Sequence, residues 1–147
     1  MKGGYVLLIN LPRAQNVPVG NLGSIRFAVG GYAYVGSALG GLEARIRRHL
    51  RTAKKKHWHI DYLLERAPVT RIIMAESGQR LECRLAARLG SRFEAVPGFG
   101  SSDCRCPGHL FFAPSPEELE AAVRQAFGGL GLEVVDLVGT GDIAIIR

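Results

Sequence analysis

The sequence predicts an α+β fold, in which a small and mostly antiparallel β-sheet is flanked by helices. A C-terminal helix and a β-hairpin extend this fold. Short apolar segments bounded by glycine and proline open the chain, and amphipathic segments occupy its centre. Strands and helices do not alternate regularly, which disfavours a parallel α/β sheet.

Length and composition fit one domain over residues 1–147, with a core at about residues 3–112 and an extension at about 114–147. The chain has 147 residues, 47% of them hydrophobic and 22% charged, so it can bury a core. Its apolar runs are shorter than the roughly 18–20 residues of a membrane helix, and its N-terminal apolar run is too short for a signal peptide. We therefore expect a cytoplasmic protein with no membrane partner.

The first third of the chain predicts three strands. Residues 5–10 form an apolar run between glycines and Pro12, residues 24–29 alternate in polarity, and residues 32–35 are again strand-like. Residues 11–23 contain two prolines and predict a loop, and Gly30-Gly31 predicts a hairpin turn.

The central and C-terminal segments predict helices and further strands. An apolar stripe formed by Leu42, Ile46, Leu50 and Ala53 predicts a helix over residues 42–56. Ser77 is the expected N-cap of a helix over residues 79–89, and Ser115-Pro116 begins another helix. The remaining predictions are a helix at 59–66, a loop at 94–108, and strands at 69–75, 110–113, 132–138 and 142–146.

The first predicted helix concentrates the positive charge of the chain. Residues 43–56 contain seven Lys or Arg and one Glu, a net of +6, which equals the net charge of the whole chain. A local basic face beside a glycine-containing turn is typical of proteins that bind a polyanion. We expect the nucleic-acid contacts to come from Arg47, Arg48, Arg51, Lys54, Lys55 and Lys56.

Several other residues have the chemistry that phosphodiester cleavage needs. The reaction requires activated water, a carboxylate for a divalent metal and a cation that neutralises the phosphate. Tyr5 and Tyr34 lie on strand-like segments, Arg45 and His49 lie one helical turn apart, and Glu82 lies on a later helix. Glu76 is a rival carboxylate. If Tyr5, Tyr34, Arg45 and Glu82 do not line one cleft, the interpretation as a nuclease fails.

The order of these residues resembles that of the GIY-YIG nuclease superfamily. Gly3 and Tyr5 match the outer letters of the first triplet, and Tyr34 and Gly36 match those of the second. Arg45 matches the helical arginine of the superfamily, and together with His49 it matches the Arg/His pair of several members. Glu82 matches the metal-binding glutamate. We expect Gly3 and Gly36 to serve as structural turn residues.

Longer strings make the resemblance more specific. The segments 34–38 (YVGSA), 57–64 (HWHIDYLL) and 99–106 (FGSSDCRC) resemble an uncharacterised GIY-YIG-like domain family. Members of that family also occur fused to endonuclease-III-type glycosylases of base-excision repair. The resemblance therefore implies a role in DNA repair, with DNA and a repair protein as partners.

The resemblance also implies a site that binds one Mg²⁺ or Mn²⁺. In the superfamily, the first motif tyrosine, here Tyr5, deprotonates or positions water, and Tyr34 and His49 support it. Arg45 binds the scissile phosphate and Glu82 holds the metal. The interval between Tyr5 and Tyr34 is longer than the family's usual spacing and accommodates an extra strand, and we find no match for the asparagine that follows the family's glutamate.

Two alternatives remain open from the sequence. The first is a nucleic-acid-binding or adaptor module that retains the fold without chemistry. The second concerns Cys104, Cys106 and His109, which could form a structural Zn²⁺ site with a fourth ligand from Cys83, His57 or His59. Their spacing is not a common zinc pattern, and Cys104 as a nucleophile is a weaker interpretation.

Overall fold

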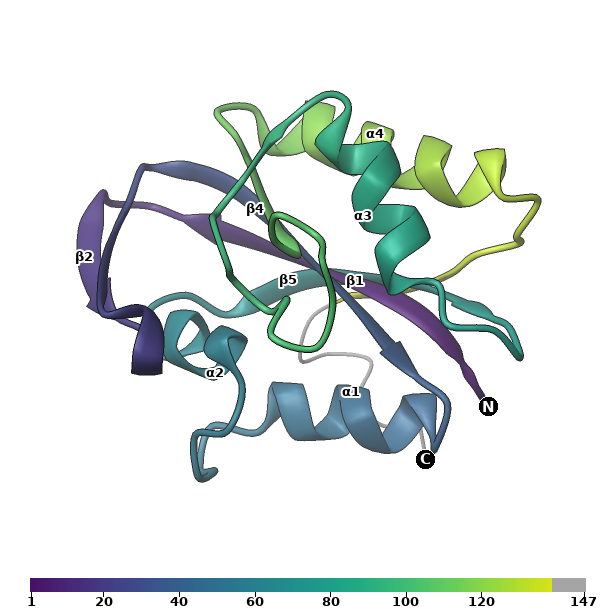
Figure 1. The fold of residues 1–147 in the computed structure, drawn as a ribbon, viewed down its shortest axis with the longest axis horizontal. Coiled ribbons are helices and arrows are strands. Elements are labelled where there is room, and N and C mark those ends of the chain that lie inside the picture. The colour runs from purple at the N-terminus through teal and green to yellow at the C-terminus, as the bar shows by residue number, and fades with distance from the viewer. Residues whose placement is uncertain (139–147) are drawn as a thin grey trace.

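The apolar segments of the sequence form one six-stranded antiparallel sheet in the computed structural model, which describes residues 1–138 (Figure 1). The strand order is β6-β7-β4-β1-β5-β8. These strands are β1 (Gly3–Leu11), β4 (Gly30–Ala38), β5 (Val69–Glu76), β6 (Glu94–Ala95), β7 (Leu110–Ala113) and β8 (Val135–Val138). The predicted fold class, α+β with a mostly antiparallel sheet flanked by helices, is confirmed.

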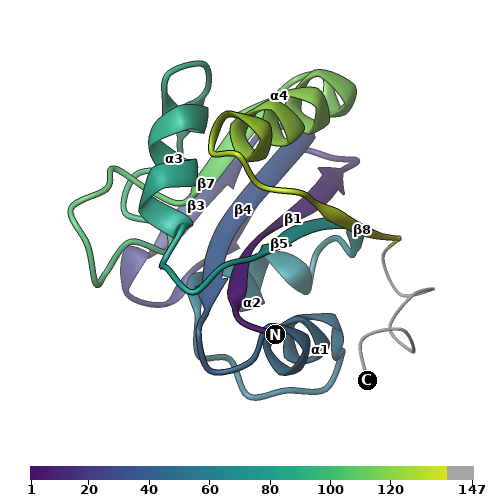
Figure 2. The ribbon, with the colours of Figure 1, turned by 90° about the vertical axis from the view of Figure 1, so that its right-hand side faces the viewer.

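Helices cover both faces of the sheet (Figure 2). One face packs against α1 (Leu42–Leu50) and α2 (His59–Leu64), and the other packs against α3 (Glu82–Gly90) and α4 (Pro116–Gly129). Because both faces are covered, the central strand β1 is buried at nearly every position. This explains why its sequence is a continuous apolar run rather than an alternating one. Within residues 1–138, no helix has the length and apolar character that crossing a membrane requires.

The segment between β1 and β4 differs from the prediction. It contains the strands β2 (Gln15–Pro18) and β3 (Ser24–Phe27), joined by a short 3₁₀ helix (Gly20–Leu22). These strands pair with each other in a separate two-stranded sheet. The predicted loop at 11–23 therefore contains a strand, and the hairpin turn predicted at Gly30-Gly31 is wrong because both glycines belong to β4.

Helix α1 ends at Leu50, six residues before the predicted end at Lys56. The Lys54 ammonium donates hydrogen bonds to the carbonyl oxygens of His49 (2.6 Å) and Arg48 (3.3 Å). These carbonyls belong to the last turn, where helical amide partners are missing, and a cation there also interacts favourably with the helix dipole. The chain therefore leaves the helix at Arg51, whose backbone is extended, and Ala53 is exposed rather than part of the apolar stripe.

Helix α3 begins at Glu82, three residues after the predicted start at Gln79. The expected cap, Ser77, instead accepts a hydrogen bond from the Gln79 amide in the preceding turn (3.1 Å). The amides of Leu81 and Glu82 donate to Ser37 Oγ, at 3.0 and 3.1 Å. A serine on β4 therefore serves the start of this helix, in the way that an N-cap side chain normally does.

The C-terminal helix begins as the sequence predicts. Ser115 Oγ accepts a hydrogen bond from the Glu118 amide (3.2 Å), and Pro116 occupies the first helical position. Strand β8 follows and pairs with β5, and Arg124 of α4 joins the two elements through an ion pair with Asp136. The second strand of the predicted hairpin, residues 142–146, lies outside the described residues.

Candidate active site

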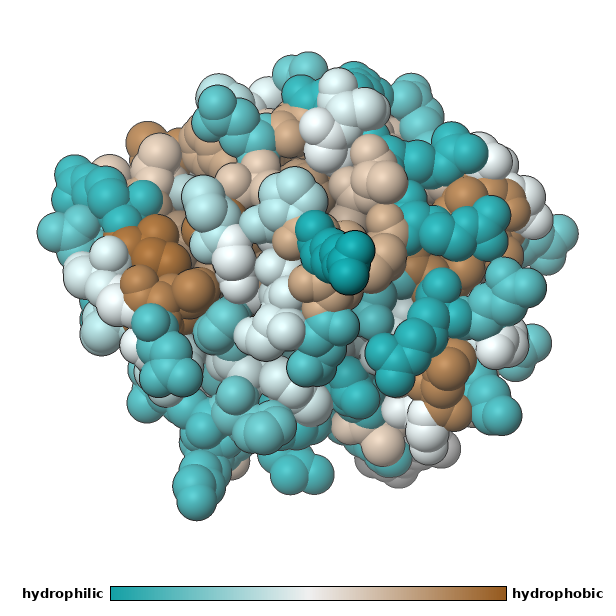
Figure 3. Space-filling model, in the orientation of Figure 1, coloured by the Kyte–Doolittle hydropathy of each residue, from teal (hydrophilic) through white to brown (hydrophobic). Residues whose placement is uncertain are grey.

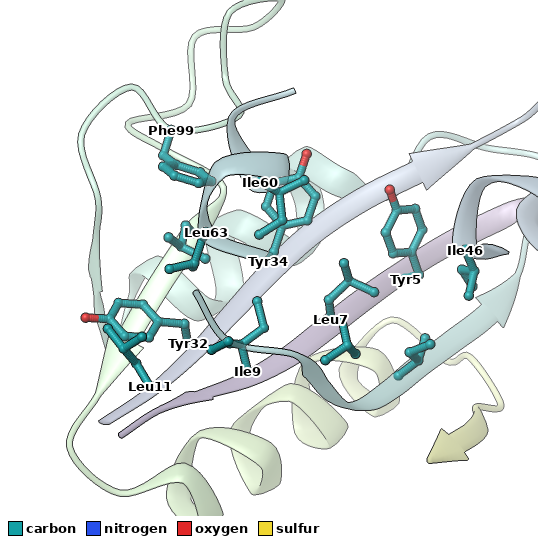
Figure 4. Packing of buried hydrophobic residues seen from close by; sticks show 14 of the residues in the cluster. Tyr5, Leu7, Ile9, Leu11, Tyr32, Tyr34, Ile46, Ile60, Leu63 and Phe99 are labelled. Carbon is teal, nitrogen blue, oxygen red and sulfur yellow. The ribbon is translucent and has the colours of Figure 1, made fainter. Parts of the chain in front are cut away.

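Tyr5 and Tyr34 lie on the same face of neighbouring strands. In the β1–β4 pairing, Tyr5 is opposite Gly36 and Leu7 is opposite Tyr34. Side chains two residues apart share a face of a strand, so both tyrosines point toward the face that α1 and α2 cover. Figure 4 shows both hydroxyl groups directed away from the sheet.

Gly36 allows the Tyr5 ring to cross β4. A Cβ atom at Gly36 would overlap the Tyr5 ring, with Tyr5 Cε1 only 2.9 Å away. A Cβ atom at Gly3 would likewise overlap the carbonyl oxygen of Ala75 on β5. Both glycines lie within strands, so the prediction that they are turn residues is wrong. They are needed for the close approach of neighbouring groups.

His49 is buried behind Tyr5. Its Nε2 atom lies 2.7 Å from Tyr5 Oη, and the two rings are 5.4 Å apart between centroids. Burial lowers the pKa of His49 to about 3, and the charge of Asp61 offsets only part of this effect, so the imidazole is neutral. Nδ1 has no hydrogen-bond partner within residues 1–138. Because a buried unpaired N–H is costly, we assign the proton to Nε2, which then donates to Tyr5 Oη.

Both tyrosines are neutral phenols near pH 7. Burial raises the pKa of Tyr5 to about 12, although the positive charge of Arg45 offsets part of the shift. Burial also raises the pKa of Tyr34, and the neighbouring Tyr5 and Glu82 raise it further. Neither phenol is therefore a ready-made base, and each is suited to hydrogen-bond water or a phosphate oxygen.

Ser37 connects the predicted phosphate-binding and metal-binding residues. Its carbonyl oxygen accepts a hydrogen bond from Arg45 Nη1 (3.2 Å), and its hydroxyl accepts from the Glu82 amide (3.1 Å). The Arg45 guanidinium also lies over the Trp58 ring, 4.6 Å from its centroid. Sequence reasoning missed both Ser37 and Trp58 as positioning residues, and the only signal for Ser37 was its place directly after Gly36.

Four of the five predicted catalytic residues line one cavity of about 510 Å³: Tyr5, Tyr34, Arg45 and Glu82. These four residues therefore line one cleft, which is the condition that the interpretation as a nuclease requires. The fifth residue, His49, contacts the cavity through Tyr5. The Glu82 side chain is 22% exposed and contacts Arg80 at 3.3 Å. The rival carboxylate Glu76 is exposed at the end of β5 and is not among the lining residues.

Three of the predicted nucleic-acid-binding residues have structural partners. Arg48 donates two hydrogen bonds of 3.0 Å to Asp61, which is fully buried. Burial would raise the Asp61 pKa, but these bonds and the amides of His57 and Trp58 hold it at about 2. Lys54 caps α1, as described above, and Lys56 pairs with Glu65 (3.0 Å).

The other three basic residues are differently placed. Arg51 and Lys55 are exposed, and Arg47 is half-buried on α1. In Figure 3, hydrophilic surface covers the lower left of the molecule, over the end of α1 and the segment that follows it. Arg47, Arg51 and Lys55 are thus the residues of the predicted basic set that remain available to a polyanion.

Beside this cavity, four potential metal ligands converge. Their ligand atoms all lie within 4.8 Å of one another, and the cluster could hold a metal ion. The structure thus selects Cys83 from the three fourth ligands left open by the sequence, because its thiol belongs to this group and the imidazoles of His57 and His59 do not. His59 instead accepts a hydrogen bond from the Gly100 amide. Burial and the neighbouring thiols raise the pKa of Cys106 to about 12. The members are Cys83, Cys104, Cys106 and His109.

The site described here lies within a region that a family model matches. The model of the domain of unknown function DUF123 matches residues 4–132, from β1 to the segment after α4. The chain belongs to the DUF123 family. The matched region contains every residue of the cavity and of the cysteine cluster, and it includes α4. Neither the curated proteins nor the solved structures gave a match.

Proposed function

We propose that this DUF123 chain is a metal-dependent endonuclease that cleaves DNA phosphodiester bonds inside the cell, in DNA repair. The observation that carries the proposal is the convergence of Tyr5, Tyr34, Arg45 and Glu82 on one cavity. These residues are far apart in the sequence and come from β1, β4, α1 and α3. Their side chains supply the phenol, cation and carboxylate groups that hydrolysis of a phosphodiester uses.

Arg45 is the proposed phosphate ligand. Its guanidinium is a permanently charged planar fork, and such a fork suits phosphate oxygens. One arm already donates to Ser37 O, and the guanidinium lies over the Trp58 ring, so the group is held in one orientation. The remaining N–H groups can then meet a phosphate without a large loss of side-chain freedom.

The carboxylate set of the cavity fits a hard divalent ion. Glu82 is partly exposed in the wall, and Asp103 lines the same cavity. Mg²⁺ and Mn²⁺ favour oxygen ligands, and Mg²⁺ commonly takes one or two carboxylates, with waters and substrate phosphate completing the shell. When bound, such an ion neutralises phosphate charge and lowers the pKa of a coordinated water.

Tyr5 is the proposed group that positions the attacking water. With the proton on His49 Nε2 and donated to Tyr5 Oη, the Tyr5 O–H is free to point into the cavity. The same hydrogen bond would stabilise negative charge developing on the phenol oxygen. Tyr34, on the next strand, lines the cavity beside it and offers a second hydroxyl.

Cleavage assays with nicked, flapped, branched and single-stranded DNA in Mn²⁺ test the proposal. Arg45→Ala and Glu82→Ala should each lower the rate by about two to three orders of magnitude, as expected for loss of an electrostatic group at the transition state. Glu76→Ala removes a carboxylate from outside the cavity and should retain the wild-type rate. Cleavage that persists in both cavity variants would point to a contaminating nuclease and overturn the proposal.

A nucleic-acid-binding module without chemistry is the second candidate. The observation in its favour is the exposure of Arg51 and Lys55 in the segment after α1. This candidate predicts salt-dependent DNA binding with no cleavage in any divalent metal. Because Lys54 and Lys56 have partners within the protein, Arg51→Ala and Lys55→Ala should weaken binding more cleanly than neutralising the whole lysine run.

A further inference from the structure

The cluster of Cys83, Cys104, Cys106 and His109 has the composition of a closed metal site. Cys83 is the second residue of α3, and the other three ligands come from the segment between β6 and β7. Cys104 Sγ already lies 3.4 Å from His109 Nε2. Tetrahedral zinc sites hold sulfur at about 2.3 Å and nitrogen at about 2.0–2.1 Å, which separates ligand atoms by roughly 3.5–3.8 Å. Small side-chain rotations would close the present separations to those values.

The chemistry of the donors selects the metal. Three sulfur atoms and one imidazole are soft or borderline ligands, which favour Zn²⁺ and disfavour Mg²⁺ and Mn²⁺. Four protein ligands leave no open position for water or substrate, so the site is structural rather than catalytic. Binding releases the thiol protons to the solvent, since thiolates are the ligands.

Burial and hydrogen bonding support His109 as a ligand. The residue is only 3% exposed and lies at the end of the loop, immediately before β7. Its Nε2 atom faces Cys104 Sγ, and its backbone is fixed on both sides, because its amide donates to the Phe99 carbonyl (2.7 Å) and its carbonyl accepts from the Val35 amide (2.9 Å). A ligand whose backbone is held in this way needs little reorganisation to meet a metal ion.

We propose that Cys83, Cys104, Cys106 and His109 bind one Zn²⁺ ion, which fastens the segment between β6 and β7 to the start of α3. Cys83 directly follows Glu82, and Cys104 and His109 line the same cavity as Glu82. The ion therefore holds one wall of the cavity at a fixed distance from the carboxylate. The zinc site stands without the nuclease proposal, since it rests on its own ligands.

Metal analysis of protein purified with a reductant, under conditions that keep any bound zinc, tests the site directly. One equivalent of zinc is expected for the wild type, and much less for Cys83→Ser and Cys106→Ser. His57→Gln is the matched control, because His57 is exposed and outside the cluster, and it should keep one equivalent. A zinc content near zero in the reduced wild type, or full zinc in Cys83→Ser, would overturn the proposal.

Cobalt gives a second measurement that does not depend on whether the variants fold. Co²⁺ added to metal-free wild-type protein should give the intense visible bands of a tetrahedral site and an ultraviolet band from thiolate ligands. Added Zn²⁺ should abolish both, and Mn²⁺ should leave them unchanged. Weak bands typical of octahedral cobalt, or displacement by Mn²⁺, would contradict a cysteine-rich tetrahedral site.

Proteolysis reports the proposed fastening. Arg105 is exposed, but it lies between the proposed ligands Cys104 and Cys106. A bound ion would hold both neighbours in place, so trypsin could cut after Arg105 only when the segment opens. Removal of zinc should raise cleavage after Arg105 about tenfold or more, since proteolysis follows the population of the open form. Cleavage in the exposed segment around Lys55 should not change. An equal rate at Arg105 with and without zinc would show that the ion does not hold the wall.

Discussion

The two faces of the sheet are built from different chemistry. The face under α3 and α4 is closed mainly by apolar side chains, including Val6, Leu85 and Phe127. The face under α1 and α2 encloses the two motif tyrosines together with the buried polar residues His49 and Asp61. Within residues 1–138, no buried polar residue lies on α3 or α4.

The difference between the faces indicates that one face mainly stabilises the fold and the other carries the candidate site. Apolar burial stabilises the fold, whereas burial of polar groups costs free energy unless they are hydrogen-bonded. On the α1–α2 face, hydrogen bonds between buried polar groups offset this cost, as between Tyr5 and His49 and between Arg48 and Asp61. The cavity lies at the end of this polar face, where the N-terminus of α3 brings in Glu82.

The largest effect on stability is expected from the apolar face. Phe127 is fully buried, so Phe127→Ala should lower the free energy of unfolding by about 3–5 kcal/mol. Urea unfolding measures this loss. Cleavage per folded molecule should stay at the wild-type value because Phe127 is not among the residues that line the cavity. A loss below about 0.5 kcal/mol, the range of surface substitutions, would contradict the assignment of this face as the main stabilising core.

Gly36→Ala should separate function from stability. The new methyl group would displace the Tyr5 ring, at a cost of about 1–3 kcal/mol, and should abolish the proposed cleavage. Gly128→Ala is the matched control, because a Cβ atom there meets open space in α4. That variant should be active and as stable as the wild type or slightly more so. Full activity of Gly36→Ala would show that the position of Tyr5 does not matter.

A smaller effect is expected for Ser37→Ala. The amides of Leu81 and Glu82 would lose their acceptor, which should destabilise the protein by about 1 kcal/mol, as loss of a helix cap does. Cleavage should fall as well, because Glu82 is no longer held, while Ser37→Thr retains the hydroxyl and should recover part of the rate. Thermal unfolding and cleavage rates would test this, and equal rates for Ala and wild type would exclude a positioning role.

The smallest effect near pH 7 is expected for His49→Gln, whose influence should emerge in acid. The pKa of His49 is about 3 in the folded protein against 6.5 for an ordinary histidine, so between these values only the unfolded chain binds this proton. Wild-type stability should therefore fall as the pH drops from about 6.5 toward 3. Burial also lowers the pKa values of His59 and His109, which act in the same direction and remain in the variant.

Comparison of the two stability profiles isolates His49. The variant should lose less stability than the wild type between pH 7 and pH 4, measured by urea unfolding at each pH. Parallel profiles would mean that His49 is not held neutral by the fold. The assignment of a neutral His49 that donates from Nε2 to Tyr5 Oη would then be wrong.

Sequence patterns predicted most strands and helices because local composition determines them. The run of β-branched residues in β5 and the Ser115-Pro116 start of α4 are examples of such local signals. Two predicted helix boundaries failed where a side chain outside the helix satisfied its backbone groups. Lys54 ended α1 early, and Ser37 moved the start of α3 to Glu82.

The sequence predicted which residues belong to the candidate site but not how their side chains converge in space. The motif positions named Tyr5, Arg45 and Glu82, yet their convergence depends on β1–β4 register and on the contact of Ser37 with α3. The basic residues show the same limit, since composition cannot distinguish Arg48, paired with buried Asp61, from an exposed cation. Cys83 joined the cysteine cluster only through the placement of α3 beside the loop.

The central claim is that Glu82 holds the divalent ion of a DNA-cleaving cavity. Anomalous diffraction from a crystal soaked in Mn²⁺ tests it most directly, with data collected at the manganese and zinc absorption edges. We expect a manganese peak beside the Glu82 carboxylate within the cavity lined by Tyr5 and Arg45. Manganese bound elsewhere with none at Glu82, or no manganese at all at saturating concentration, would contradict the claim.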